Sequence, residues 1–121
     1  MFLKLNHQKL DVFTISRTFV FECYKLCNTL PSDERFGMIS QIRRAAVSVY
    51  LNIAEGASRK SAIERKRFYE IARGSAIEID AALDIANDLG YLKNYDLIKL
   101  SEAMISSFKL LSALIKLNAK D

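Results

Sequence analysis

Two cysteines and one histidine are the residues of this sequence that are best suited to metal or redox chemistry. Cys23 and Cys27 lie four residues apart, so that on a helix both thiols would share one face and could supply half of a metal site. The sequence holds no third cysteine, and His7 precedes the first predicted helix. Both thiols fall on an apolar arc, which favours buried side chains. We therefore expect no metal, no cofactor and no disulfide.

Acidic residues form a second candidate site. Asp80, Asp84 and Asp88 follow one another at intervals of four residues, which aligns them along one side of a helix. Such a ridge could attract a divalent cation, but a solvated face is the favoured interpretation. The sequence also lacks the GxGxxG, GxxxxGK[ST], HExxH and GxSxG signatures. We predict that the protein is not an enzyme.

Basic residues are unevenly distributed along the chain. The net charge is +4, from 18 basic and 14 acidic residues. The segment from position 35 to position 73 contains nine basic residues and only three acidic ones. The densest basic group in it is Arg59, Lys60, Arg65, Lys66 and Arg67. One interpretation is that this group binds the phosphates of RNA or DNA. The alternative is a protein-interaction scaffold whose basic residues only solvate its rim.

Four segments with a 3.6-residue apolar repeat must position these groups. They cover approximately residues 8–30, 36–55, 61–89 and 95–118 of a 121-residue chain that is 50% hydrophobic. Short polar connections imply a single all-α domain, an antiparallel up-down four-helix bundle. No apolar run is long enough for a membrane span and no leader is readable, so we expect a cytoplasmic protein without a membrane partner.

Local signals predict where these helices begin and end. Pro31 stops the first helix, and Gly56 is expected to end the second in a left-handed turn. Ser61 and Glu64 form a capping box at the start of the third helix. Asn94 is the expected N-cap of the fourth.

The apolar repeat also predicts which faces are buried. For the third helix the expected core residues are Phe68, Ile71, Ala72, Ser75, Ile79, Ala82, Leu83, Ala86 and Leu89. For the fourth they are Leu97, Leu100, Met104, Phe108, Leu111 and Ile115.

More apolar surface is present than one isolated bundle needs. The second helix is apolar around most of its circumference, and the fourth carries a second seam of Ala103, Leu110, Leu114 and Leu117. Such surface usually marks an interface, so we predict a homo-oligomer with Leu110, Leu114 and Leu117 in the contact; the alternative is a monomer with an apolar surface. Gly74 and Ala81 lie on the same flank of the third helix. We interpret Gly74 either as a point where another helix approaches closely or as a tolerated substitution without a structural role.

One polar strip interrupts the apolar second helix. It consists of Arg44, Ser48, Asn52 and Glu55. Buried polar groups persist when they are hydrogen-bonded, so we interpret the strip as a structural network in which Glu78 accepts a hydrogen bond from Arg43 or Arg44. A ligand-binding strip is the less favoured alternative.

Several blocks of the sequence resemble a known family. They are Phe36-Gly37-Met38, Gln41-Ile42-Arg43-Arg44-Ala45-Ala46-Val47-Ser48, Asn52-Ile53-Ala54-Glu55-Gly56, Arg67-Phe68, Ile71-Ala72-Arg73-Gly74-Ser75 and Glu78. Together they resemble the bacterial four-helix-bundle proteins encoded by intervening sequences within 23S ribosomal RNA genes. The resemblance implies a left-handed up-down bundle that assembles into a homopentameric, barrel-like ring. It also implies, through a related accessory protein of diversity-generating retroelements, a basic surface for nucleic acid and a reverse-transcriptase-like partner.

Overall fold

The computed structural model describes residues 2–5 and 11–119. Its four long helices are α1 (Asp11–Cys27), α2 (Met38–Ala57), α3 (Ala62–Asp88) and α4 (Ile98–Asn118), and a short 3-10 helix, η2 (Ser32–Glu34), follows α1. The described part of the chain contains no strand, which confirms the all-α prediction. Within these ranges no helix is both long and apolar enough to cross a membrane.

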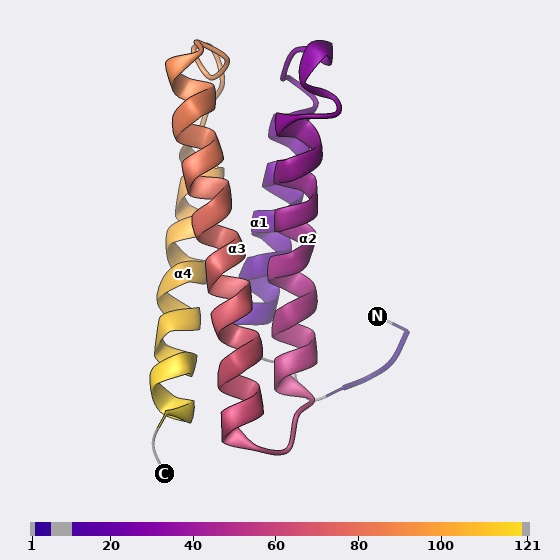
Figure 1. The fold of residues 1–121 in the computed structure, drawn as a ribbon, viewed down its shortest axis with the longest axis vertical. Helices are drawn as coiled ribbons and strands as arrows, with labels where there is room; N and C mark the ends of the chain where they lie inside the picture. Colours follow the sequence, from indigo (N-terminus) through magenta and orange to yellow (C-terminus); the bar gives the residue numbers. More distant parts are fainter. Residues whose placement is uncertain (1, 6–10, 120–121) are drawn as a thin grey trace.

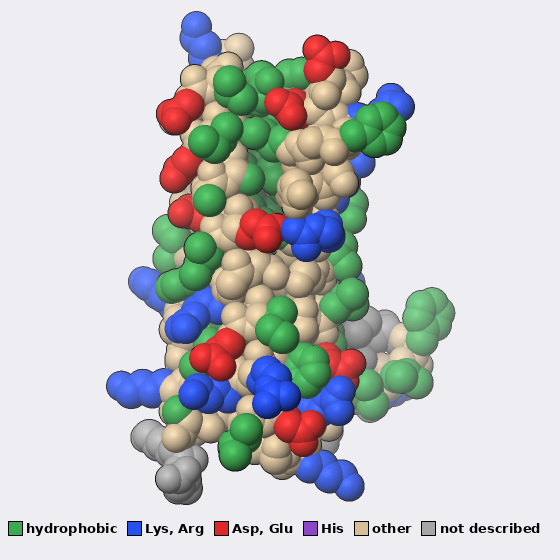
Figure 2. Space-filling model, in the orientation of Figure 1, with side chains coloured by type: hydrophobic (Ala, Val, Ile, Leu, Met, Phe, Trp, Pro, Cys, Tyr) green, Lys and Arg blue, Asp and Glu red, His purple; other side chains and the backbone are tan. Residues whose placement is uncertain are grey.

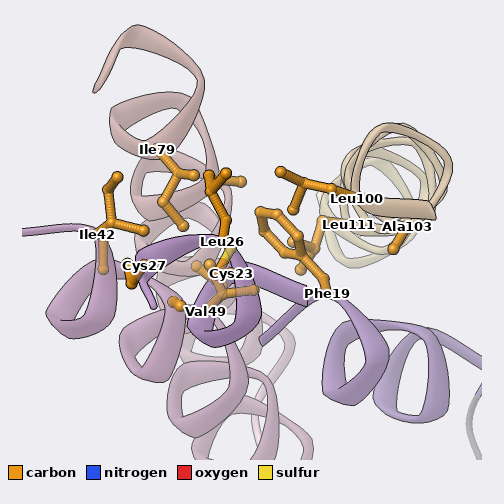
Figure 3. Packing of buried hydrophobic residues seen from close by; sticks show 14 of the residues in the cluster. Phe19, Cys23, Leu26, Cys27, Ile42, Val49, Ile79, Leu100, Ala103 and Leu111 are labelled. Atoms are coloured by element: carbon orange, nitrogen blue, oxygen red, sulfur yellow. The ribbon is translucent and has the colours of Figure 1, made fainter. Parts of the chain in front are cut away.

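The helices lie side by side along the long axis of the molecule (Figure 1). Each helix packs against the next one in the chain, and α4 also packs against α1, so that every helix has two neighbours. Side chains from all four helices meet along the middle (Figure 3). The largest of the fully buried side chains are Phe19, Leu26, Ile42, Ile53, Ile79, Leu100 and Leu111.

Two of the predicted helix ends differ from the structure. Gly56 does not end α2 in a left-handed turn: it lies within the helix and is buried, and α2 continues to Ala57. A Cβ at Gly56 would stand only 2.9 Å from the Cβ of Phe68, so glycine is needed here for the close approach of α2 and α3. Gly90 has the only positive φ in the described ranges, +80°, just after the end of α3. Asn94 does not cap α4, because the carboxylate of Asp96 accepts from the Ile98 N–H instead, at 3.0 Å.

The predicted core of α3 and α4 is partly wrong. Ile71 and Leu89 are exposed, whereas Tyr69 and Ala76, which were not among the expected core residues, are buried. On α4, Phe108 is exposed, whereas Ala103 and Ser107 are buried. The physical reason is that each helix carries apolar residues on two sides, and a 3.6-residue repeat does not indicate which side faces inward.

Candidate nucleic-acid interface

The predicted basic group lies around the turn that joins α2 to α3, at the end of the molecule drawn lowest in Figure 1. The Ser61 side chain fixes the start of α3, because its Oγ accepts a hydrogen bond from the Glu64 N–H at 3.1 Å. The reciprocal half of the capping box differs from the prediction: the Glu64 carboxylate accepts from the Ser61 hydroxyl at 3.2 Å. The turn is therefore anchored by its own side chains.

Arg65 connects three parts of this end of the protein. Its guanidinium donates to the backbone carbonyls of Arg59, at 3.0 Å, and Lys60, at 2.8 Å. Its Nε donates to the Asn118 Oδ1 at 2.8 Å, in the last turn of α4. Asn118 in turn donates to the Leu114 carbonyl at 2.8 Å. With these bonds in place, Arg65 supports the turn rather than presenting its charge to a ligand.

Arg59 is also engaged inside the subunit. Its guanidinium lies 3.0 Å from the Glu55 carboxylate and 3.8 Å from that of Glu64. Its Cζ lies 4.8 Å from the centre of the Phe68 ring, within cation–π range. Two nearby carboxylates offset its charge, which weakens Arg59 as a phosphate ligand.

The remaining three cations of the group differ from Arg59 and Arg65. Within residues 2–5 and 11–119, Lys60, Lys66 and Arg67 make no ion pair. Lys60 and Arg67 are exposed and Lys66 is half-buried. Basic side chains gather in the lower half of the face seen in Figure 2, where this turn lies. Lys66 and Arg67 border an open hollow of about 540 Å³ between the start of α3 and the end of α4, which is also lined by Ser61, Ala62, Ile63, Glu70, Asn118 and Ala119.

The predicted polar strip divides into separate contacts. Arg44 donates to Glu78 at 2.5 Å, which links α2 to α3. Ser75 donates to the Ser48 hydroxyl at 2.9 Å, and Asn52 donates to the Ser48 carbonyl at 2.8 Å. The Arg44–Glu78 and Ser75–Ser48 bonds join α2 to α3, whereas the Asn52–Ser48 bond lies within α2.

Two further residues assigned to this network have different partners. Arg43 donates to Asn28 at 3.2 Å and lies over the Tyr24 ring, whereas Glu55 pairs with Arg59. The strip is therefore not a continuous ligand surface.

The thiols are placed where they have little reactivity. Cys23 and Cys27 are both buried in the core. Burial raises the pKa of the Cys23 thiol, and the neighbouring Cys27 and Glu22 add to the increase. Burial also raises the pKa of the Cys27 thiol, against an opposing influence of the Arg43 guanidinium. Among the described residues no group of three or more His, Cys, Asp or Glu side chains could hold a metal, and His7 lies outside them.

The predicted oligomer contact is only partly on the surface. Leu110 and Leu114 are half-buried and pack against the core of their own subunit. Leu117 is 63% exposed. A shallow apolar groove between α3 and α4 adds to the exposed apolar surface; it is lined by Ala76, Ile77, Asp80, Met104, Ile105, Phe108 and Lys109.

Sequence spacing did not reveal the Arg65–Asn118 contact, because its two residues are 53 positions apart. The same holds for Arg73, which donates to Ser112 at 3.3 Å across α3 and α4, 39 positions away. A single sequence gives no signal for either pair.

Comparison with models of protein families identifies the family of the chain. The model of the 23S rRNA-intervening sequence protein matches residues 8–113. The chain belongs to this family. No curated protein matches the chain. The part matched by the 23S rRNA-intervening sequence protein model includes the whole α2–α3 turn but ends within α4, so Asn118, the partner of Arg65, lies beyond it.

Proposed function

We propose that this chain is a non-enzymatic, homo-oligomeric binding protein that contacts RNA or DNA through Lys60, Lys66 and Arg67. Its subunit is an up-down four-helix bundle, and the family resemblance favours five subunits in a ring. The observation that carries the nucleic-acid proposal is the division of the basic group. The side chains of Arg59 and Arg65 form ion pairs or hydrogen bonds within the subunit. Among the described residues, the side chains of the other three cations form neither.

The chemistry of this surface suits phosphate better than bases. The planar guanidinium of Arg67 can donate two parallel hydrogen bonds to a phosphate, and the two lysines act as point charges. The first turn of α3 adds free backbone N–H groups and a partial positive charge. Phe68 and Tyr69, the nearest rings on α3, are half-buried and buried, so they offer no stacking platform for bases. We therefore infer binding with little dependence on base sequence.

Salt dependence provides the test. Each neutralised phosphate contributes about 0.9 to the slope of log affinity against log salt for duplex DNA, and about 0.7 for single strands. Replacing Lys60, Lys66 and Arg67 together with Gln should therefore lower the slope by about 2 to 3 if each cation meets one phosphate. Electrophoretic shifts with a structured RNA and with duplex DNA, at several salt concentrations, measure the affinity and its salt slope.

A matched control removes the same charge from another region. Lys93, Lys99 and Lys109 are exposed and lie outside the α2–α3 turn. Their combined replacement with Gln lowers the net charge equally and should leave most of the affinity and slope in place. Equal losses in the two triple variants, or no binding by the wild-type protein at low salt, would overturn the nucleic-acid proposal and favour a protein scaffold that uses the α3–α4 groove.

Assembly is tested at Leu117. A glutamate there is solvated in an isolated subunit but would be desolvated in a contact, so Leu117→Glu should lower the mass of the assembly without loss of helix content. Leu110 and Leu114 are less suitable, because a charge there would also disturb the subunit core. Ser101→Glu, exposed on the same helix, is the control. Light scattering measures the mass of the assembly for both variants. An unchanged mass for Leu117→Glu would show that Leu117 does not lie in the contact between subunits.

A further inference from the structure

A hollow between α1 and α2 is lined mainly by aromatic side chains. Its volume is about 470 Å³, within the range that is usual for small-ligand sites. Its lining includes Arg17, Val20, Phe21, Tyr24 and Tyr50. Three of these side chains are rings, and the proposed phosphate contacts at the α2–α3 turn do not use them. Rings gathered in this way offer flat apolar surfaces to a planar ligand.

Two of the three rings are held in position by neighbours within the subunit. The Arg43 guanidinium lies 5.4 Å from the centre of the Tyr24 ring, within cation–π range. The centre of the Tyr50 ring lies 4.4 Å from that of Phe13. A ligand that stacks in the hollow therefore meets rings that have already lost part of their freedom, which lowers the entropic cost of binding.

The charge of the hollow is positive. In the part of its lining that the structure describes, Arg17 is the one charged residue, and it forms no ion pair there. Burial raises the pKa of the Tyr50 hydroxyl, and the positive charge of Arg17 opposes this increase, so the cation lies near that ring. Arg43 adds a second positive charge beside Tyr24. A ligand that combines a planar ring with an anionic group matches this arrangement.

We propose that the hollow binds an unpaired base of a single-stranded nucleic acid, stacked on Phe21 and Tyr24, with a phosphate of the same strand at Arg17. Stacking accepts every base, because each base has a π-face, so the site favours single strands without selecting a sequence. Bases within a duplex are stacked on one another and cannot enter. The site rests on the proposed function and deepens it, because it specifies the form of nucleic acid that is bound.

The hollow lies close enough to the α2–α3 turn for one strand to contact both. Tyr50 lies seven residues before Ala57, the end of α2, which is about 10 Å along the helix axis. The other side of the hollow belongs to α1, which packs against α2 (Figure 1). Modules that bind single strands contact about 4–16 nucleotides, which is enough to cover this distance. The phosphates at the turn and the base in the hollow can therefore belong to the same strand.

Three DNA probes of equal length separate the base from the phosphates. An oligothymidylate carries both, an abasic strand carries only the sugar-phosphate backbone, and a duplex keeps its bases paired. The wild-type protein should bind the oligothymidylate about tenfold more tightly than the abasic strand. In Phe21→Ala/Tyr24→Ala these two affinities should become equal, whereas the affinity for the duplex should not change. Fluorescence anisotropy of labelled probes measures the affinities, and circular dichroism checks that the variant is folded.

A matched control removes two exposed rings that lie outside the hollow. Phe108 and Tyr24 are both 38% exposed, and each has an arginine guanidinium over its ring. Phe36 is exposed like Phe21, and each has a cation 5.9 Å from its ring centre. Phe36→Ala/Phe108→Ala should therefore keep the wild-type preference for the oligothymidylate. Phe21→Tyr/Tyr24→Phe retains both rings in the hollow and should keep it as well.

The possible results distinguish the stacking site from the phosphate contacts at the turn. Equal wild-type affinities for the oligothymidylate and the abasic strand would overturn the stacking site and leave the proposed function intact. The same conclusion follows if Phe21→Ala/Tyr24→Ala keeps the preference, or if the control variant loses it equally. A lower assembly mass for Phe21→Ala/Tyr24→Ala in light scattering would overturn the site by showing that the hollow is a contact between copies. Failure of the wild-type protein to bind any of the three probes at low salt would overturn both proposals.

Discussion

Replacing Gly56 with alanine is expected to destabilise the protein by about 1–3 kcal/mol. The new Cβ would lie 2.9 Å from the Cβ of Phe68 and 3.0 Å from the Tyr69 ring. The Phe68 Cβ is fixed to the backbone of α3, so relief requires the two helices to separate. Alanine improves helix propensity by about 1 kcal/mol, which offsets part of this cost. Urea denaturation followed by circular dichroism measures the change.

Gly74→Ala is the matched control. It lies in the same pair of helices, but its new Cβ meets no atom within 4 Å, so only the helix propensity should change. We expect a gain of up to about 1 kcal/mol. Both variants are compared at low protein concentration, where self-association contributes little. If alanine were tolerated equally at both positions, the close α2–α3 contact at Gly56 would be contradicted.

Phe19→Ala should cost still more, about 3–5 kcal/mol. Phe19 is fully buried on α1, in the core that α1 shares with α4 (Figure 3). Truncation removes the ring from the contact that joins the first helix to the last and leaves a cavity that rigid helices cannot fill completely. The free energy of unfolding, again from urea denaturation, provides the measurement.

Phe21→Ala makes the comparison within the same helix. Phe21 is 65% exposed, two residues further along α1, so its loss should change the free energy of unfolding by less than about 0.5 kcal/mol. A similar cost for the two phenylalanines would show that α1 is rotated from the orientation described above.

The sequence was sufficient to predict the number of long helices and most of their extents. A 3.6-residue repeat and short polar connections are local signals, and the side chain of Ser61 acts on a backbone N–H only three residues away. Pro31 is also a local signal, because it lies only four residues beyond the end of α1. Features of this kind depend on neighbours in the chain and can be read from them.

Features that depend on distant segments could not be predicted in this way. Gly56 is a residue type common at helix ends, but the approach of Phe68 and Tyr69 makes it an interior contact. Ile71 and Tyr69 are both apolar, and only the positions of α2 and α4 decide which one is buried. In the basic group, five similar charges look equivalent until Asn118 engages Arg65 and the glutamates engage Arg59.

Burial of both natural cysteines makes the protein suitable for site-selective labelling. A thiol reacts as its thiolate, and burial disfavours that form at Cys23 and Cys27. A cysteine introduced on the outer face of α3 would then be the one that takes a spin label or a fluorophore, with the native pair left in place. Distances between labels on two copies could thus be measured without first redesigning the core.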